Sequence, residues 1–261
     1  MSIEIDDLGG GIWRLRLNRP ERRNAWSADC GEEMTSALLR IEADPRVRCA
    51  VLTGAGDVFC SGVDLRAGFE RGPDGTPNLQ GMHRRYFVPT ILGIRNLSKP
   101  VIGAVNGPAI GFGASLALAP DFTVMAESAT LVYGFVKLGL CPDSGSTAAL
   151  PARAGRQRAM AAAMLGDPIS AAKAVEWGLV HAAVPDSDLT TEVEELAARL
   201  AKGPTRAYAA IKRAFNAQER PALAEQLEVE GEFVQSLAGT RDFAEGLAAF
   251  VQRRAPAFVG A

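Results

Sequence analysis

The chain of 261 residues contains only two histidines and four cysteines, and its net charge is only −2. The cysteines show no CxxC spacing, so we expect reduced thiols and no metal site at Cys30, Cys49, Cys60 and Cys141. Because 28 basic residues balance 30 acidic ones, the composition predicts neither nucleic-acid nor membrane binding. No apolar run of about 18 residues and no signal peptide is visible, so we expect a cytoplasmic protein.

Hydrophobic residues make up 48% of the chain, which allows a sizeable core and excludes an intrinsically disordered protein. Alternating apolar and polar residues predict a strand at 12–17. Short apolar runs predict further strands, and helical spacing of apolar residues predicts helices between them. These strands are at 49–53, 101–105 and 122–126, and the helices are at 28–43 and 80–96. Such alternation is typical of an α/β protein with a parallel or mixed sheet.

The last third of the chain has a different pattern, because it shows helical spacing and no strand signal. Helices are predicted from Leu189 onward and at 205–215, 223–237 and 242–253. We therefore expect an α/β core over residues 1–190 and a helical region over residues 191–261.

Two glycine-rich segments, residues 57–65 and 106–116, each follow a predicted strand. Glycine beside a helix start lets a ligand approach the backbone, where unpaired N–H groups favour negative charge. Taken alone, these glycines are better explained by turns and close packing. The second segment is not a dinucleotide fingerprint, because Leu116 stands where the third glycine would be.

The combination of motifs is much more specific, and the chain resembles the crotonase (enoyl-CoA hydratase/isomerase) superfamily from end to end. The resemblance is carried by Leu17-Asn18-Arg19-Pro20 with Asn24-Ala25, Val51-Leu52-Thr53-Gly54-Ala55-Gly56, Phe59-Cys60-Ser61-Gly62-Val63-Asp64-Leu65, Lys99-Pro100-Val101-Ile102-Gly103-Ala104-Val105-Asn106-Gly107, Leu138-Gly139-Leu140-Cys141-Pro142, Ala174-Val175-Glu176-Trp177-Gly178-Leu179-Val180 and Phe250-Val251-Gln252-Arg253-Arg254. It implies a spiral core of ββα units, a helical trimerisation region, and a homotrimer or hexamer. It also implies an acyl-CoA thioester substrate, with coenzyme A as part of that substrate and no permanently bound cofactor.

In this family two backbone N–H groups hold the thioester oxygen, and by position they are those of Val63 and Phe112. Removing a proton next to a thioester places negative charge on that oxygen. Donors fixed in place lower the barrier, each by about 10²–10³ in rate. Asp64, directly after Val63, is expected to stabilise the loop by a hydrogen bond rather than to take part in the chemistry.

The two glutamates with which hydratases of this family activate water are both replaced here. Ser115 stands at the first of these positions, and Phe135 stands at the second. Neither side chain is an effective base, so the sequence argues against ordinary hydration of enoyl-CoA substrates.

Asp143 is the acid that remains at a position relevant to the family. Relatives with aspartate there include epoxyphenylacetyl-CoA and dienoyl-CoA isomerases, where it moves a proton, and chlorobenzoyl-CoA dehalogenases, where it is a nucleophile. One carboxylate suits isomerisation, since it takes a proton from one carbon and returns it to another. Its uncharged sequence neighbours predict a raised pKa. The alternative is that Asp143 caps a helix starting near Ser144.

Further residues match positions that contact the substrate in relatives: Ser61, Gly62, Arg66, Gly111, Phe135, Phe250 and Arg253. Ser61 and Arg66 match the adenine and phosphate ends of coenzyme A, although Arg66 is equally compatible with a solvated charge. Phe250 and Arg253 match a C-terminal helix that reaches the coenzyme A of a neighbouring subunit. An acyl-CoA isomerase is the favoured function. The alternatives are a hydratase with an unidentified base, a dehalogenase or thioesterase with an Asp nucleophile, and a non-catalytic acyl-CoA binder.

Overall fold

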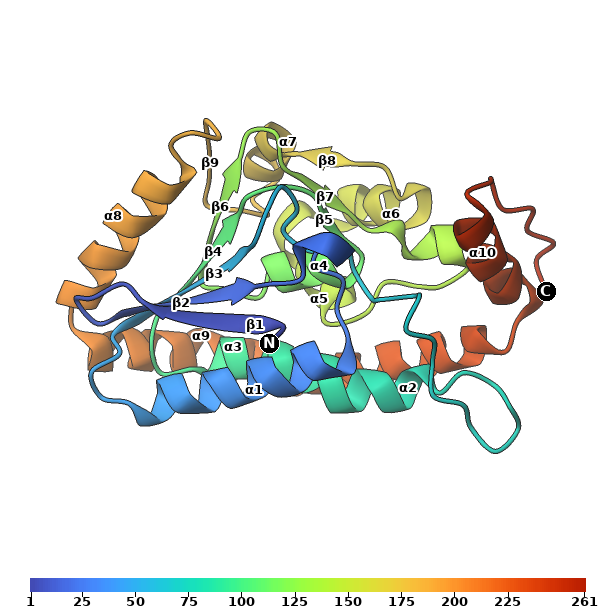
Figure 1. The fold of residues 1–261 in the computed structure, drawn as a ribbon, viewed down its shortest axis with the longest axis horizontal. Coiled ribbons are helices and arrows are strands. Elements are labelled where there is room, and N and C mark those ends of the chain that lie inside the picture. The colour runs from blue at the N-terminus through green and yellow to red at the C-terminus, as the bar shows by residue number, and fades with distance from the viewer.

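The structure is a computed structural model that describes residues 1–261, except for the side chains of residues 218–222. A six-stranded sheet forms its centre, with long helices beneath it and further helices at both ends (Figure 1). The strands lie in the order β1 (Ile3–Asp7), β2 (Ile12–Leu17), β3 (Cys49–Gly54), β4 (Val101–Val105), β6 (Phe122–Ala126) and β9 (Ala182–Val184). β1 is antiparallel to β2, and the other neighbours are parallel. The four strands predicted from the sequence are confirmed.

A second sheet of three short strands lies beside the first and carries part of the functional site. It consists of β5 (Ala109–Ile110), β7 (Thr130–Val132) and β8 (Ile169–Ser170). β5 and β7 are parallel, whereas β7 and β8 are antiparallel. Cys60, in the segment after β3, also forms a parallel bridge with Ala109. The chain therefore steps from the large sheet into the small one after β3 and again after β4.

The helices agree in place with the sequence patterns, with differences in detail. They are α1 (Ala28–Ala43), α2 (Leu79–Met82), α3 (Val88–Asn96), α4 (Phe112–Ala117), α5 (Ser146–Ala154), α6 (Arg156–Leu165), α7 (Ala171–Glu176), α8 (Leu189–Lys202), α9 (Thr205–Ala238) and α10 (Arg241–Gln252), with 3₁₀ turns at Pro20–Arg22 and Gly134–Leu138. α1 has the predicted bounds, and the side chain of Ser27 caps its first turn. The single helix predicted at 80–96 is divided, because a π-helical segment (His83–Phe87) lies between α2 and α3.

Helix α9 corrects one prediction, since the helices expected at 205–215 and 223–237 are one helix of 34 residues. It runs beneath the molecule for most of its length and packs against α2, α3 and α5 (Figure 1). Near its start the Lys212 ammonium donates to Asp121 Oδ2 at 2.6 Å and to the carbonyl oxygen of Lys99 at 3.0 Å. These contacts fix the N-terminal half of α9 to the segments that precede β4 and β6.

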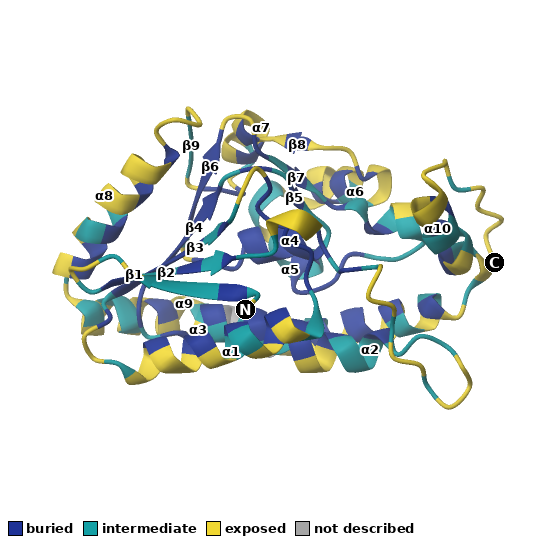
Figure 2. Ribbon diagram, viewed as in Figure 1, coloured by how far each residue is buried: buried dark blue, intermediate teal, exposed yellow. Residues whose placement is uncertain are grey.

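The core lies between the large sheet and the helices that cover it, where the strands and inner helix faces are buried (Figure 2). Met34 on α1, Leu52 on β3 and Ile102 on β4 are each at most 1% exposed. Helices α1 and α8 bury their apolar faces against the sheet, as their helical periodicity predicts. Within the described part of the chain, no helix is long and apolar enough to span a lipid bilayer.

Candidate active site

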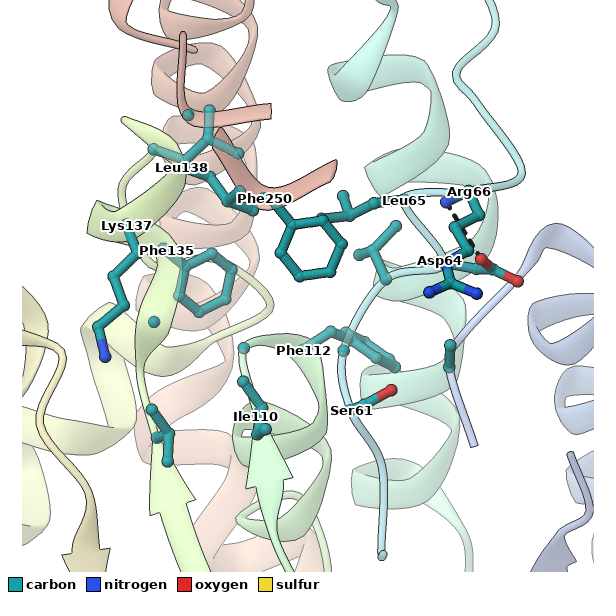
Figure 3. Close-up of a pocket in the computed structure, with 18 of the residues that line it drawn as sticks. Ser61, Asp64, Leu65, Arg66, Ile110, Phe112, Phe135, Lys137, Leu138 and Phe250 are labelled. Carbon is teal, nitrogen blue, oxygen red and sulfur yellow. Dashed lines mark hydrogen bonds between the residues drawn. The ribbon is translucent and has the colours of Figure 1, made fainter. Parts of the chain in front are cut away.

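A cavity of about 640 Å³ opens where the small sheet, α2, α9 and α10 meet the segment after β3 (Figure 3). Its interior is mostly apolar and is lined by Leu79, Met82, Phe87, Phe112, Phe135, Leu140 and Val234. Basic side chains also contribute to the lining: Arg22, Arg23, Arg66, Lys137 and Arg254. The cavity therefore combines an apolar chamber with cationic groups.

Nine of the ten site residues predicted from the sequence line this one cavity. They are Ser61, Gly62, Val63, Arg66, Gly111, Phe112, Phe135, Asp143 and Phe250. The tenth, Arg253, does not line it, and its neighbour Arg254 does. Arg253 is the C-cap of α10 with φ of 54°, so the chain changes direction there.

The backbone amides of Val63 and Phe112 are brought together because the two loops that carry them are hydrogen-bonded to each other. The Ile110 N–H donates to the Cys60 carbonyl at 2.9 Å, and the Cys60 N–H donates to the Pro108 carbonyl at 3.3 Å. Among the described residues, neither the Val63 nor the Phe112 N–H has an acceptor within the chain. Phe112 is the first residue of α4, where helical N–H groups have no intrahelical partner. Both residues line the cavity, and neither amide is engaged by the described part of the chain.

Glycine is required at two places for these loops to approach. A Cβ at Gly113 would overlap the carbonyl oxygen of Cys60 in the opposite loop. Gly62 has φ of +91°, and a Cβ there would lie 2.8 Å from the Ile110 carbonyl oxygen. A side chain at either place would push the two amides apart.

Residues from the N-terminal part of the chain, Arg19 and Trp26, hold the loop around Val63. The Trp26 N–H donates to the Gly62 carbonyl at 2.7 Å, and the Asp64 N–H donates to the Trp26 carbonyl at 2.8 Å. The buried Asp64 carboxylate accepts from Arg19 at 2.8 Å and from the Arg66 N–H at 3.2 Å. The loop-stabilising hydrogen bonds predicted for Asp64 are therefore present. The ion pair with Arg19 was not foreseen, since 45 residues separate the partners.

Aromatic rings pack around Phe112, the residue that carries the second backbone amide. The Phe112 ring stacks on Phe87 with centroids 4.7 Å apart and packs against Trp26 at the same distance. Both neighbours are buried, so the first turn of α4 has little room to move.

Asp143 lines the cavity and is buried, with 5% of its surface exposed. Burial and the negative charge of Glu230 raise the pKa of Asp143 to about 7, and the hydrogen bond from Ser144 lowers it by a smaller amount. Ser144 Oγ donates to Asp143 Oδ1 at 2.8 Å. The alternative prediction of a helix N-cap is wrong, because α5 begins at Ser146 after Gly145 and has no side-chain cap.

Comparison with known proteins gives the family of the chain. A family model described as enoyl-CoA hydratase/isomerase matches residues 7–261. The chain belongs to the enoyl-CoA hydratase/isomerase family. The predicted α/β fold with a helical C-terminal region is confirmed by an enoyl-CoA hydratase structure from Mycobacterium avium subsp. paratuberculosis K-10. That structure is 33% identical with a TM-score of 0.89, over 99% of both chains.

Two curated members of the hydratase/isomerase family illustrate the range of reactions among its relatives. The chain is 43% identical to 1,2-epoxyphenylacetyl-CoA isomerase of Escherichia coli K12, over 100% of this chain and 99% of the relative. It is 34% identical to 4-chlorobenzoyl coenzyme A dehalogenase-2 of an Arthrobacter species, over 96% and 90%.

The two positions where hydratases of this family carry glutamate have different surroundings here. Ser115 is buried and does not line the cavity; its Oγ donates to the Asp143 carbonyl at 3.1 Å and lies 2.6 Å from Ser146 Oγ. Phe135 lines the cavity as an apolar wall. One position therefore supports the segment that carries Asp143, and the other shapes the chamber.

Glu230 is a residue near the site that sequence reasoning missed. It is 1% exposed on α9, and its carboxylate accepts from the Gly145 N–H at 2.8 Å and the Thr147 N–H at 3.0 Å. A signal was present in the sequence, because Glu230 falls at helical spacing among the buried Leu223, Leu227 and Val234. An acid on the buried face of a helix requires a partner.

His83 is a buried histidine that contacts the turn after Asp143. Its Nε2 accepts from the Ser144 N–H at 3.3 Å, and burial lowers its pKa to about 4. It does not line the cavity. No cluster of three or more His, Cys, Asp or Glu that could hold a metal ion occurs among the described residues.

Proposed function

We propose that this protein isomerises an acyl-CoA thioester, by shifting a double bond or rearranging a strained ring, with Asp143 as its single acid–base group. One observation carries the proposal. Two backbone N–H groups without an acceptor among the described residues line the same apolar cavity as the buried carboxyl of Asp143, which has no cationic partner among those residues. The other acids of the lining are less suited to proton transfer, because Asp64 is paired with Arg19 and Glu21 is exposed.

In the proposed reaction the thioester oxygen accepts hydrogen bonds from the N–H groups of Val63 and Phe112. The Asp143 carboxylate takes a proton from a carbon of the acyl group, and the electron pair of that C–H bond moves toward the thioester oxygen as an enolate. The protonated Asp143 then returns the proton to another carbon. The substrate and product have equal mass. A pKa of about 7 suits this role, since both protonation states of Asp143 are accessible near neutral pH.

The lining of the cavity supports coenzyme A as part of the substrate. Arg22, Arg23, Arg66, Lys137 and Arg254 provide positive charge where the phosphate groups of coenzyme A would bind. The apolar interior, with the rings of Phe87, Phe112 and Phe135, suits an uncharged acyl group.

A homotrimer or hexamer is the second part of the proposal. Large apolar side chains of α9 and α10 are exposed in the single chain, notably Ile211, Phe215, Phe233, Phe250 and Val251. Burying them against further copies would stabilise an oligomer. Light scattering at micromolar concentration checks this, and a stable monomer contradicts it.

Four other functions give different results in one experiment. The protein is incubated with a panel of acyl-CoA thioesters, and the products are measured by mass. Isomerisation leaves the mass unchanged, hydration adds one water, thioester cleavage releases free coenzyme A, and dehalogenation replaces a halogen by hydroxyl. A non-catalytic binder gives no product but raises its melting temperature with the ligand.

The decisive variant is Asp143→Asn, which keeps the shape of the side chain and removes the base. We expect turnover to fall by about 10²–10⁴, with little change in acyl-CoA affinity measured by calorimetry. Affinity should persist because the backbone donors and the basic residues are untouched. Near-normal turnover of the folded variant would remove Asp143 from the mechanism.

A further inference from the structure

Four elements hold the turn that presents Asp143, and their contacts converge on residues 143–147. Ser115 of α4 donates to the Asp143 carbonyl, and His83 of the π-helical segment accepts from the Ser144 N–H. Glu230 of α9 accepts from the next amides of the turn, while the N-terminus of α5 continues from it. Ser144 has φ of 58°, a left-handed conformation that is strained for a residue other than glycine. The surrounding contacts must therefore maintain this shape.

In its contacts with the turn, the carboxylate of Glu230 only accepts hydrogen bonds. Its Oε2 accepts from the Gly145 N–H, and its Oε1 accepts from both the N–H and the Oγ of Thr147. The Thr147 hydroxyl is free to donate because it accepts from Gln226 Nε2 at 2.7 Å. Three donors and no described acceptor favour the ionised carboxylate over the protonated acid. Burial acts in the opposite direction and raises the pKa of Glu230.

We propose that Glu230 is a positioning residue for Asp143: it fixes the turn of residues 143–147 and keeps a second negative charge behind the base. The inference rests on the proposed function, in which Asp143 transfers the proton. Glu230 does not line the cavity, so it acts through the turn and through its charge. It belongs to α9, whereas Asp143 precedes α5, so the link joins the helical C-terminal region to the active site.

The charges around Asp143 make this effect specific. The titratable groups that face it are Glu230 on α9, His83 on the π-helical segment and Cys141 on its own loop. His83 is neutral near pH 7, since its pKa is lowered to about 4, and burial raises the pKa of Cys141 to about 12. Glu230 is therefore the neighbour that supplies charge. A like charge favours the protonated form of Asp143 and strengthens it as a base.

The test compares Glu230→Gln with Glu232→Gln, which removes the same charge from an exposed position two residues along α9. Carboxyl ¹³C NMR follows the titration of Asp143 without any substrate, and Asp143→Asn assigns the signal. We expect Glu230→Gln to lower the pKa of Asp143 by about one unit and Glu232→Gln to leave it in place. An unmoved Asp143 titration in folded Glu230→Gln overturns the proposal.

Kinetics separate the positioning role from the charge. With a thioester that the wild type isomerises, Glu230→Gln should lower kcat by about 10–10² and move the acidic limb of the pH profile to lower pH. Thr147→Val removes one donor to Glu230 but keeps the negative charge of Glu230. We therefore expect kcat to fall several-fold while the acidic limb of the pH profile stays at the same pH. Should Glu230→Gln fail to fold, an unchanged kcat in Thr147→Val overturns the proposal. If the NMR shift appears but Asp143→Asn retains turnover, the proposed function fails and the link from Glu230 stands.

Discussion

The buried carboxyl of Asp143 should make the protein less stable as the pH rises, and replacing it by asparagine should remove this dependence. The pKa of Asp143 is raised from 3.8 to about 7 in the folded chain. Below pH 3.8 the carboxyl is protonated in both the folded and unfolded states and does not affect the equilibrium. Between pH 3.8 and about pH 7 the unfolded chain releases the proton while the folded chain keeps it. Unfolding therefore becomes progressively more favourable as the pH rises.

The size of the effect follows from the shift, because one pKa unit corresponds to about 1.4 kcal/mol. A raise of about three units therefore costs the folded wild type up to about 4 kcal/mol above pH 7. The asparagine side chain of the Asp143→Asn variant carries no charge at any of these pH values, and its amide oxygen can still accept from Ser144. We expect this variant to be more stable than the wild type at pH 8, with the advantage shrinking toward pH 4.

Urea unfolding followed by circular dichroism measures this at several pH values between 4 and 8.5, at one fixed protein concentration. Asp167→Asn is the matched control, because Asp167 is exposed on the surface. The quantity that decides is the difference in free energy of unfolding between variant and wild type. A difference that stays constant over the whole range would refute the reasoning, since it would mean that Asp143 titrates alike in both states.

Three further predictions concern residues in and around the site. Gly113→Ala should abolish turnover and lower solubility, checked by kinetics and light scattering, because the new methyl group overlaps the backbone of the opposite loop. Arg19→Met should lower the free energy of unfolding by about 3 kcal/mol in urea melts, since it leaves Asp64 buried and unpaired. Adding Asp64→Asn should recover part of that loss, and no recovery would contradict the pairing. Ser115→Glu with Phe135→Glu should be necessary for appreciable hydration, so wild-type hydration of crotonyl-CoA at roughly 1–10³ s⁻¹ would show the reasoning to be wrong.

The sequence predicts the sheet and α1 well because those elements are defined locally. Alternation over 12–17 and the apolar runs at 101–105 and 122–126 are complete signals in themselves, and the strands have these bounds. The continuity of α9 was missed because the apolar pattern pauses between the two predicted helices. The continuous helix packs against α2, α3 and α5, and a short stretch of sequence carries no information about those contacts.

The site was predicted to a similar extent and for similar reasons. The positions of Val63, Phe112 and Asp143 followed from motifs, and the structure places all three at one cavity. The apolar neighbours of Asp143 predicted the direction of its pKa shift, but not the contribution of Glu230. That acid lies far along the chain from Asp143, so only the folded structure brings the two together.

Helix α9 has a geometric consequence for the tolerance of the chain to insertions. Lys212 near one end contacts the segments that precede β4 and β6, and Glu230 near the other holds the turn after Asp143. These residues are about 18 positions apart, which is about five helical turns and roughly 27 Å, so they share one face. Inserting a single residue between them would rotate Glu230 by about 100° and move it away from Gly145. The number of residues between Lys212 and Glu230 thus sets the position of Glu230 relative to the sheet. The exposed positions of α9 in this part should tolerate amino-acid replacement, but the helix should not tolerate a change in length.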